Sequence, residues 1–166
     1  MSPNPPTRDV VAQPGRRHAL LATLAVIAWG VGNPVAADPS RDIVVWKSPT
    51  CGCCKDWIVH LRKNGFRVTS HDIDDTAAVR ARLGMPESQA SCHTASVGGY
   101  VIEGHVPARE LQRLLRERPR ALGLSVPGMV VGSPGMDTPA YGGRSDPYDV
   151  RLVQRDGATQ VYASYP

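Results

Sequence analysis

The stretch SPTCGCCKDWIVHLRKNGF, residues 48–66, places three cysteines within four positions and then continues as an amphipathic helix. Apolar residues recur at helical spacing from Trp57 to Leu61, and Asn64-Gly65 is a typical helix end. The pattern predicts a helix over residues 55–63 with the cysteines grouped at its start. These cysteines have three possible roles, namely a redox pair, a structural disulfide or a set of metal ligands.

Strand-like and helical segments alternate on both sides of this stretch. The apolar run DIVVW precedes it and FRVTSHDI follows it, and both have strand patterning. In chain order the prediction is a strand at 42–46, the cysteine helix, a strand at 66–73, a helix at 76–83, strands at 94–97 and 100–103, and a helix at 108–117. This β-α-β-α-β-β-α order predicts an α/β, thioredoxin-like fold whose first two strands are parallel.

The segment that begins at Leu124 has a different composition, dense in glycine and proline and without periodicity. It contains two Pro-Gly-Met triplets, which end at Met129 and Met136. A strand-like run at 148–153 and the turn signal Asp156-Gly157 follow. We expect an ordered Gly/Pro-rich loop that packs back on the domain, and then a short hairpin at the edge of the sheet.

Residues 14–38 have the order of a secretory signal peptide. An arginine pair precedes an apolar run at about 19–31, and Val35-Ala36-Ala37 forms a small-x-small cleavage site. The apolar run is shorter than the roughly 20 residues that a membrane-spanning helix needs. The arginine pair also permits twin-arginine export. We therefore expect a signal peptide at 1–37, an exported mature domain at 38–166, and no stable membrane anchor after cleavage.

The charge of the mature chain argues against a polyanionic partner. The whole chain carries a formal charge of +4, of which three arginines and one aspartate in residues 1–37 account for +2, leaving +2. The sequence has no lysine-rich arm and no set of aromatic residues for stacking on bases. We therefore expect no nucleic-acid partner.

Export brings the cysteines into an oxidising environment, where an even number favours disulfides. Because a Cys53–Cys54 bond would close a strained ring, that interpretation pairs Cys51 with Cys54 and Cys53 with Cys92. Cys51 and Cys54 also have the C-x-x-C spacing of thiol-disulfide oxidoreductases, whereas Cys51 and Cys53 have the C-x-C spacing of metal-binding loops. A helix start stabilises thiolates, which serves either chemistry.

Cys92 favours metal binding among these alternatives. In a thioredoxin-like fold the loop before the hairpin faces the start of the cysteine helix, so a fourth sulfur would point at the other three. Oxidoreductases of this fold place a proline there, usually cis, whereas this sequence reads Ser91-Cys92-His93-Thr94. A redox pair gains little from two further thiols, because they divert its mixed disulfides.

Four convergent thiolates suit a soft metal ion. Zinc accepts four sulfurs, but structural zinc sites usually draw their cysteines from two separated loops rather than three from one turn. Cuprous copper accepts two or three sulfurs and tolerates bridging thiolates. Equal numbers of Cu(I) ions and thiolates also form a neutral cluster, which avoids burying uncompensated charge. The sulfurs therefore favour Cu(I), with more than one ion per chain.

Softer candidates surround the cysteines. His93 follows Cys92, His105 follows the hairpin, and Met129 lies in a segment with too few apolar residues to be an obvious core. Each also has a structural interpretation, because histidines bond to carbonyls and methionines fill cores. Met136 is a weaker candidate than Met129. The remaining histidines are expected to be structural or incidental: His18, His60 and His71.

Three motifs, TCGCCKDW, SCHTASVGGYVIEGHVPARELQRLL and GLSVPGMVVGSPGM, are similar to those of the bacterial periplasmic copper-resistance family of the CopG type, formerly a domain of unknown function. They occur in order and extend over essentially the whole mature chain. The resemblance implies a periplasmic thioredoxin-like domain with a role in copper resistance or handling. It also implies that the cysteines bind copper, either as single ions or as a multinuclear cluster.

Carried over by position, the resemblance assigns the metal-binding cysteines and three neighbours: Cys51, Cys53, Cys54 and Cys92, with His93, His105 and Met129. The family often reads Pro-Gly-Met-Pro where this chain has Val130 after Met129. That difference loosens the loop around Met129.

The favoured hypothesis is a periplasmic copper-binding protein that sequesters, transfers or changes the oxidation state of copper. Its partners would be copper ions and other periplasmic copper-handling proteins. The alternatives are a periplasmic thiol-disulfide oxidoreductase using Cys51 and Cys54, and a disulfide-stapled interaction module without a ligand. The sequence identifies no general base or substrate pocket, so whether the protein is an enzyme is left open.

Cleavage after Ala37 gives the first testable prediction. Because a small-x-small motif precedes the polar Asp38, the exported protein should begin at Asp38. Amino-terminal sequencing of protein from the periplasmic fraction measures this directly. Retention of Met1 would contradict the export hypothesis.

Overall fold

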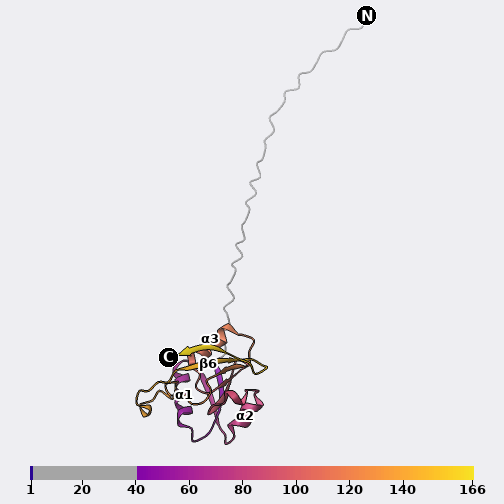
Figure 1. Cartoon of the computed structure of the whole chain (residues 1–166). Coiled ribbons are helices and arrows are strands. Elements are labelled where there is room, and N and C mark those ends of the chain that lie inside the picture. The colour runs from indigo at the N-terminus through magenta and orange to yellow at the C-terminus, as the bar shows by residue number, and fades with distance from the viewer. Residues whose placement is uncertain (2–40) are drawn as a thin grey trace. The chain divides into compact units, whose positions relative to one another are not determined.

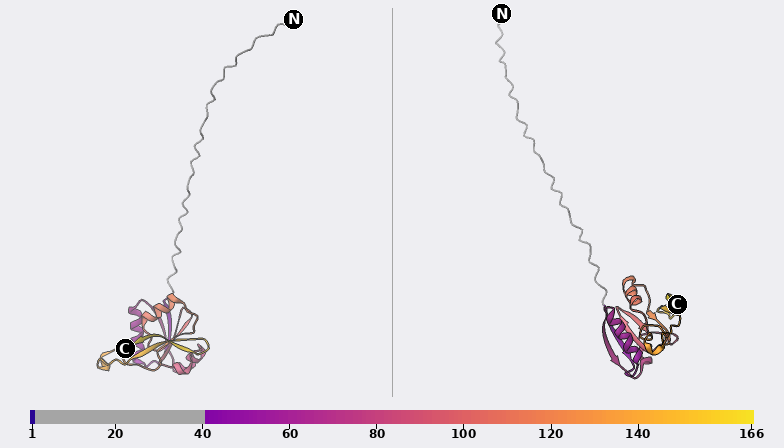
Figure 2. Two further views of the ribbon diagram at one scale, coloured as in Figure 1. Left: turned by 45° about the horizontal axis from the view of Figure 1, so that its top comes forward. Right: turned by 90° about the vertical axis from the view of Figure 1, so that its left-hand side faces the viewer.

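The structure, a computed structural model, describes Met1 and residues 41–166. The predicted signal peptide and its cleavage site lie outside the described residues. Residues 41–166 form a mixed α/β fold with three α-helices and one seven-stranded sheet (Figures 1 and 2). None of the helices in this part of the chain is both long and apolar enough to span a membrane.

The sheet contains parallel and antiparallel strands in the order β2-β1-β3-β4-β5-β6-β7. The strands are β1 (Asp42–Lys47), β2 (Arg67–Asp72), β3 (His93–Val97), β4 (Tyr100–Glu103), β5 (Gly123–Ser125), β6 (Tyr148–Val153) and β7 (Thr159–Tyr165). The helices are α1 (Gly52–Lys63), α2 (Thr76–Arg82) and α3 (Ala108–Glu117), with short 3₁₀ turns at Glu87–Gln89 and Pro139–Tyr141.

Strand β1, second from the β2 edge of the sheet, pairs differently with its two neighbours. It pairs in parallel with β2, as the sequence predicts, and antiparallel with β3. β3 and β4 form a tight hairpin around Gly98 and Gly99, whose φ angles are 55° and 86°. Both angles lie in the left-handed region, which explains glycine at both positions of this turn.

One apolar cluster joins α1 and α3 to the central strands. Trp57 and Leu61 of α1, Leu111 and Leu114 of α3, and Ile102 of β4 are all fully buried in it. Burial of each such side chain contributes about 1.5–3 kcal/mol relative to exposure. Because α1 is held against the sheet along its whole apolar face, the cysteines at its start have a fixed position.

A smaller cluster covers the opposite face of β4. Val101 packs there with Met85 and Val153. Glu103 lies two residues beyond Val101 in the same strand, so it points to the same face. There its carboxylate meets the guanidinium of Arg80 from α2, with Nη1 3.3 Å from Oε1.

The cysteine helix begins earlier than the sequence predicts, at Gly52 rather than residue 55. Cys51 is the N-cap residue in an extended conformation, and Cys53 and Cys54 belong to the first turn. Glycine has a low helix propensity and Cys51 makes no side-chain cap, so neither standard start signal marks this end.

The carboxyl-terminal segment adds one strand that the sequence analysis missed. β5 has three residues and lies between β4, to which it is parallel, and β6, to which it is antiparallel. A Cβ atom at Gly123 would lie 1.6 Å from the Val101 carbonyl oxygen, so only glycine fits. The β6–β7 hairpin forms at the edge of the sheet as expected.

Helix α3 is capped by a side chain of α1. Pro107, its N-cap residue, offers no side-chain acceptor, and the Ala108 N–H donates instead to Nε2 of His60 at 3.1 Å. Because Nε2 accepts this bond, the imidazole must be neutral with its proton on Nδ1. Burial lowers the pKa of His60, and nearby Asp137 partly offsets this.

The lowered pKa of His60 makes stability depend on pH. Unfolded His60 binds a proton below about pH 6.5, while the folded ring resists it. The free energy of unfolding should therefore be highest above pH 6.5 and fall as the pH decreases below it. His60→Gln keeps an acceptor that does not titrate, so the decline of its free energy of unfolding should be shallower. The difference should be less than about 1 kcal/mol, because the His60 side chain is partly exposed to solvent.

Denaturant titrations of wild type and His60→Gln between pH 5 and pH 8 measure this difference. The buried rings of His93 and His105 also have lowered pKa values and are present in both proteins. The difference between the two curves therefore isolates His60. Parallel curves would show that His60 does not contribute.

Candidate metal centre

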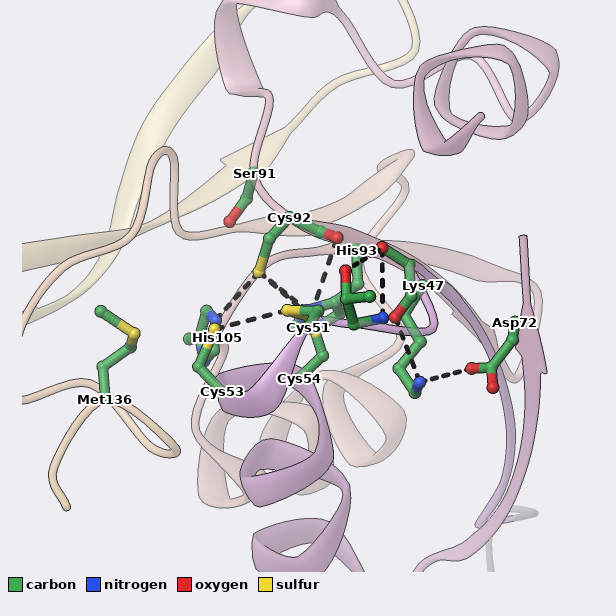
Figure 3. Close-up of a disulfide and its surroundings, with 12 residues drawn as sticks. Lys47, Cys51, Cys53, Cys54, Asp72, Ser91, Cys92, His93, His105 and Met136 are labelled. Carbon is green, nitrogen blue, oxygen red and sulfur yellow. Dashed lines mark hydrogen bonds and ion pairs between the residues drawn. A yellow bond between two sulfur atoms is a disulfide. The ribbon is translucent and has the colours of Figure 1, made fainter. Parts of the chain in front are cut away.

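The four cysteines come from two segments that the sheet brings together. β1 leads into α1, and β3 begins directly after Cys92. In the antiparallel pairing of these strands Lys47 lies opposite His93, so the end of β1 and the start of β3 are at the same edge. The Sγ atoms of Cys51, Cys53, Cys54 and Cys92 all lie within 4.8 Å of one another (Figure 3).

Two of these cysteines form a disulfide and two are free thiols. The disulfide joins Cys51 to Cys54, and Cys53 and Cys92 are free. One half of the pairing considered from the sequence therefore forms, while the Cys53–Cys92 bond does not. The sulfur of Cys92 instead contacts Cys54 at 3.4 Å, and that of Cys53 contacts Cys51 at 3.5 Å. A site that uses all four sulfurs thus requires the reduced protein.

His105 presents a nitrogen lone pair to Cys92. Its Nδ1 lies 2.8 Å from the Pro134 carbonyl oxygen, and its Nε2 lies 3.1 Å from the Cys92 sulfur (Figure 3). A carbonyl only accepts, so Nδ1 carries the proton and Nε2 is the free acceptor. Burial lowers the pKa of His105, which keeps the ring neutral. A backbone carbonyl that orients the outer nitrogen in this way is typical of metal-binding histidines.

His93 lies on the other side of Cys92 and is completely buried. Its Nδ1 is 3.4 Å from the Cys92 sulfur, and its ring packs against Trp57 and His105. Burial, and then His105, hold its pKa well below the ordinary value. Its Nε2 is the one buried side-chain nitrogen or oxygen in the described part of the chain that lacks a hydrogen-bond partner. Such an orphaned nitrogen fits a ligand set better than a core.

The thiol of Cys92 is protonated in the metal-free protein. Burial, and then the neighbouring Cys53, raise its pKa to about 12. A thiol must lose its proton before it binds a metal ion. Because Nε2 of His105 can accept that proton, Cys92 and His105 form a matched donor and acceptor pair. Cys92, His93 and His105 also form a second potential ligand group, with ligand atoms within 4.8 Å.

The two methionines occupy different environments. Met129, the preferred candidate from the sequence, has a side chain that is 59% exposed. Met136, the less favoured one, is buried and belongs to the surroundings of the disulfide shown in Figure 3. Its Sδ accepts a hydrogen bond from the Tyr141 hydroxyl at 3.1 Å. The structure therefore buries Met136 and leaves Met129 exposed, although Gly128 before Met129 bonds to the backbone of Ala90 close to Cys92.

Gly135 explains how Met136 reaches this position. Its φ is +87°, and a Cβ atom there would lie 2.7 Å from both the Cys53 carbonyl oxygen and the Trp57 nitrogen. The Gly/Pro-rich loop thus packs directly on the first turn of α1, as the sequence analysis expected of an ordered loop. The same loop provides Pro134, which orients His105.

Sequence reasoning missed several charged residues around the site. The side chain of Lys47 is buried and donates to the carboxylate of Asp72 and to the Ser48 carbonyl oxygen (Figure 3). Glu103 is fully buried at the end of an apolar strand. The sequence does contain a signal for Glu103, because a charged residue at the end of an apolar strand is almost never buried without a partner, so a partner such as Arg80 could have been sought.

Comparison with known proteins gives two results. A family model described as a protein of unknown function, DUF411, matches residues 89–136, which include Cys92, His93 and His105. Two solved structures described as copper resistance protein copG, form 1 and form 2, are each 50% identical, with a TM-score of 0.70. The matches cover 77% and 75% of this chain and 98% of each of those chains. No curated protein matches the sequence significantly.

The free thiols can be mapped by alkylation. In metal-free oxidised protein, iodoacetamide should label Cys53 and Cys92 and leave Cys51 and Cys54 unlabelled until a reductant is added. Peptide mass spectrometry before and after reduction measures this. Recovery of a Cys53–Cys92 disulfide would contradict the arrangement seen here.

Proposed function

Because the chain belongs to the CopG-type family of copper-resistance proteins, we propose that its reduced cysteine cluster binds Cu(I) as cargo. The protein would act in the periplasm, where it sequesters copper, transfers it to other copper-handling proteins or changes its oxidation state. The convergence of four sulfurs from two separate segments carries this proposal. Nothing in a simple disulfide-stapled domain requires a third and fourth thiol at the same place.

The donor set supports copper over zinc. Three sulfurs within one helical turn cannot spread tetrahedrally around a single zinc ion as readily as they bridge several Cu(I) ions. The nitrogen atoms of His105 and His93 lie beside Cys92. Imidazole nitrogen binds copper in both oxidation states, so these rings can retain copper when fewer sulfurs are available.

The disulfide supplies a balanced route for a change in oxidation state. Two Cu(II) ions would take two electrons from the thiols of Cys51 and Cys54, which form the disulfide and release two protons. The products are two Cu(I) ions and the oxidised protein. In that state Cys53, Cys92, His93 and His105 are the donors that remain.

A thioredoxin-like description of the fold belongs to the same proposal. Its support is the position of the cysteines at the start of the helix that follows β1, opposite the residue that enters β3. Residues 41–166 contain no cis peptide bond, so the loop at Cys92 differs from the cis-proline loop of oxidoreductases with this fold.

A second candidate function is thiol-disulfide exchange by Cys51 and Cys54. The disulfide between them favours it. The two functions differ in what they need from Cys92, since a redox pair works without it.

The substitution Cys92→Ser separates the two functions. A serine hydroxyl is a hard, poor ligand for Cu(I), so anaerobically reduced Cys92→Ser should bind fewer Cu(I) ions, or bind them at least tenfold more weakly. Wild type should bind more than one Cu(I) ion per chain and prefer Cu(I) to Zn(II). Equilibrium dialysis with a cuprous chelator measures both, and insulin reduction is assayed on the same samples.

His60→Gln is the matched control, since His60 lies on α1 outside the cluster. It should bind copper as wild type does. Full copper loading of Cys92→Ser, or a wild type that binds a single zinc ion and no excess copper, would contradict the cluster. Robust reductase activity in wild type and Cys92→Ser alike would favour the exchange function.

A further inference from the structure

A single buried carboxylate, that of Glu103, accepts hydrogen bonds from the residues on either side of Cys92 and His93. Glu103 at the end of β4 is completely buried and pairs with Thr94 in the β3–β4 ladder. It accepts hydrogen bonds from the Ser91 N–H at 2.8 Å and from the Thr94 hydroxyl at 2.6 Å. Ser91 precedes Cys92 and Thr94 follows His93, so this carboxylate connects the residues on either side of the Cys92-His93 pair.

Arg80 completes this arrangement from helix α2. Its guanidinium donates to Glu103 at 3.3 Å and to the Ser91 carbonyl oxygen at 3.5 Å. The side chain is almost fully buried, and its outer edge pairs with the exposed carboxylate of Glu87. Both backbone groups of Ser91 are therefore held, the N–H by Glu103 and the carbonyl by Arg80.

A role limited to stability does not account for this network. Replacing a buried ion pair by apolar side chains of similar volume is often neutral or stabilising. A fully satisfied polar network does specify one geometry for the groups that it bonds. Residues 87–92, directly before β3, contain no proline to restrict the backbone, so hydrogen bonds are the available means of fixing Cys92.

We propose that Glu103, supported by Arg80, is a positioning residue that holds the Cys92 sulfur against Cys54 and His105. The carboxylate fixes the backbone on both sides of Cys92, and the 3.4 Å and 3.1 Å contacts of the sulfur follow from that. The effect on copper rests on the proposed function, whereas the position of the thiol does not.

The chain offers a closely matched control in Glu110. Its side chain is also buried, and it likewise accepts hydrogen bonds from an arginine, Arg109, and from the hydroxyl of Tyr165, with Arg113 as a second ion-pair partner at 3.9 Å. It lies on α3, and none of its partners is next to a cysteine. Loss of Glu110 should therefore reproduce the loss of a buried carboxylate without releasing Cys92.

The experiment measures thiol reactivity in metal-free protein with the Cys51–Cys54 disulfide intact. Iodoacetamide alkylates the two free thiols, and mass spectrometry gives the ratio of the Cys92 rate to the Cys53 rate within each molecule. Glu103→Leu removes every acceptor and should raise this ratio about tenfold, because the loop opens locally. Glu103→Gln keeps an oxygen for the Ser91 N–H and should return the ratio to within about threefold of wild type.

Glu110→Leu should leave the ratio at the wild-type value, even where its melting temperature falls. If Glu103→Leu does not fold, Thr94→Val removes one of the carboxylate's donors while preserving shape, and should raise the ratio in the same direction. A ratio that is unchanged in folded Glu103→Leu, or in Thr94→Val when that variant replaces it, would overturn the proposal. An equal rise in Glu110→Leu would overturn it as well.

A second measurement tests whether the position of the Cys92 sulfur affects Cu(I) binding. In reduced protein, Glu103→Leu should weaken Cu(I) binding and alter the cuprous-thiolate luminescence, while Glu110→Leu should change neither. Unaltered copper binding in Glu103→Leu together with a raised alkylation ratio would contradict the link to the metal site and keep the positioning role. A wild type that binds no copper would contradict the proposed function, and the alkylation ratios would still decide the role of Glu103.

Discussion

The antiparallel pairing of β1 with β3 is the constraint on which the cysteine cluster depends. It sets Lys47 opposite His93, so the chain that enters α1 and the chain that enters β3 meet at one edge of the sheet. A slip of one residue in this register would turn every side chain of β3 to the other face. Cys92 would then no longer face the start of α1. The burial of Val45 and Ala95, opposite each other in these strands, fixes the register.

Burial keeps the histidine rings of the site in the neutral form that can bind a metal ion. An imidazole ring removed from water favours its neutral form, and the neutral form has the lone pair that a metal ion needs. The Gly/Pro-rich loop contributes to this by covering the first turn of α1 and by holding Nδ1 of His105 through Pro134. The loop thus excludes water and selects the tautomer at the same time, so a segment without regular structure is part of the site.

Sequence patterns predicted the features that depend on local chemistry. The helix that carries the cysteines, strand β1 and the edge hairpin follow from periodicity and turn residues, and the meeting of Cys92 with the other cysteines follows from the expected order of elements. β5 was missed because three residues have no periodicity, and only pairing with β4 and β6 defines it. The burial of Met136 and the exposure of Met129 could not be predicted, because both depend on how the loop folds back, and the preference for Met129 as a ligand stays a prediction. The Cys53–Cys92 pairing failed because sulfur-to-sulfur geometry is not encoded in spacing.

Copper binding and the disulfide compete for the same sulfurs, which ties the two chemistries together under the proposed function. Cys51 and Cys54 donate to the cluster only as thiolates, so Cu(I) binds the reduced protein more tightly than the oxidised one. Linkage requires the converse, that bound Cu(I) stabilises the reduced state by the same free energy. Cys53, Cys92, His93 and His105 stand outside the disulfide, so they provide the donors common to both states. A fixed Cys92 therefore matters in both states, because it is one of the two sulfurs of that constant group and also the neighbour of the disulfide at Cys54.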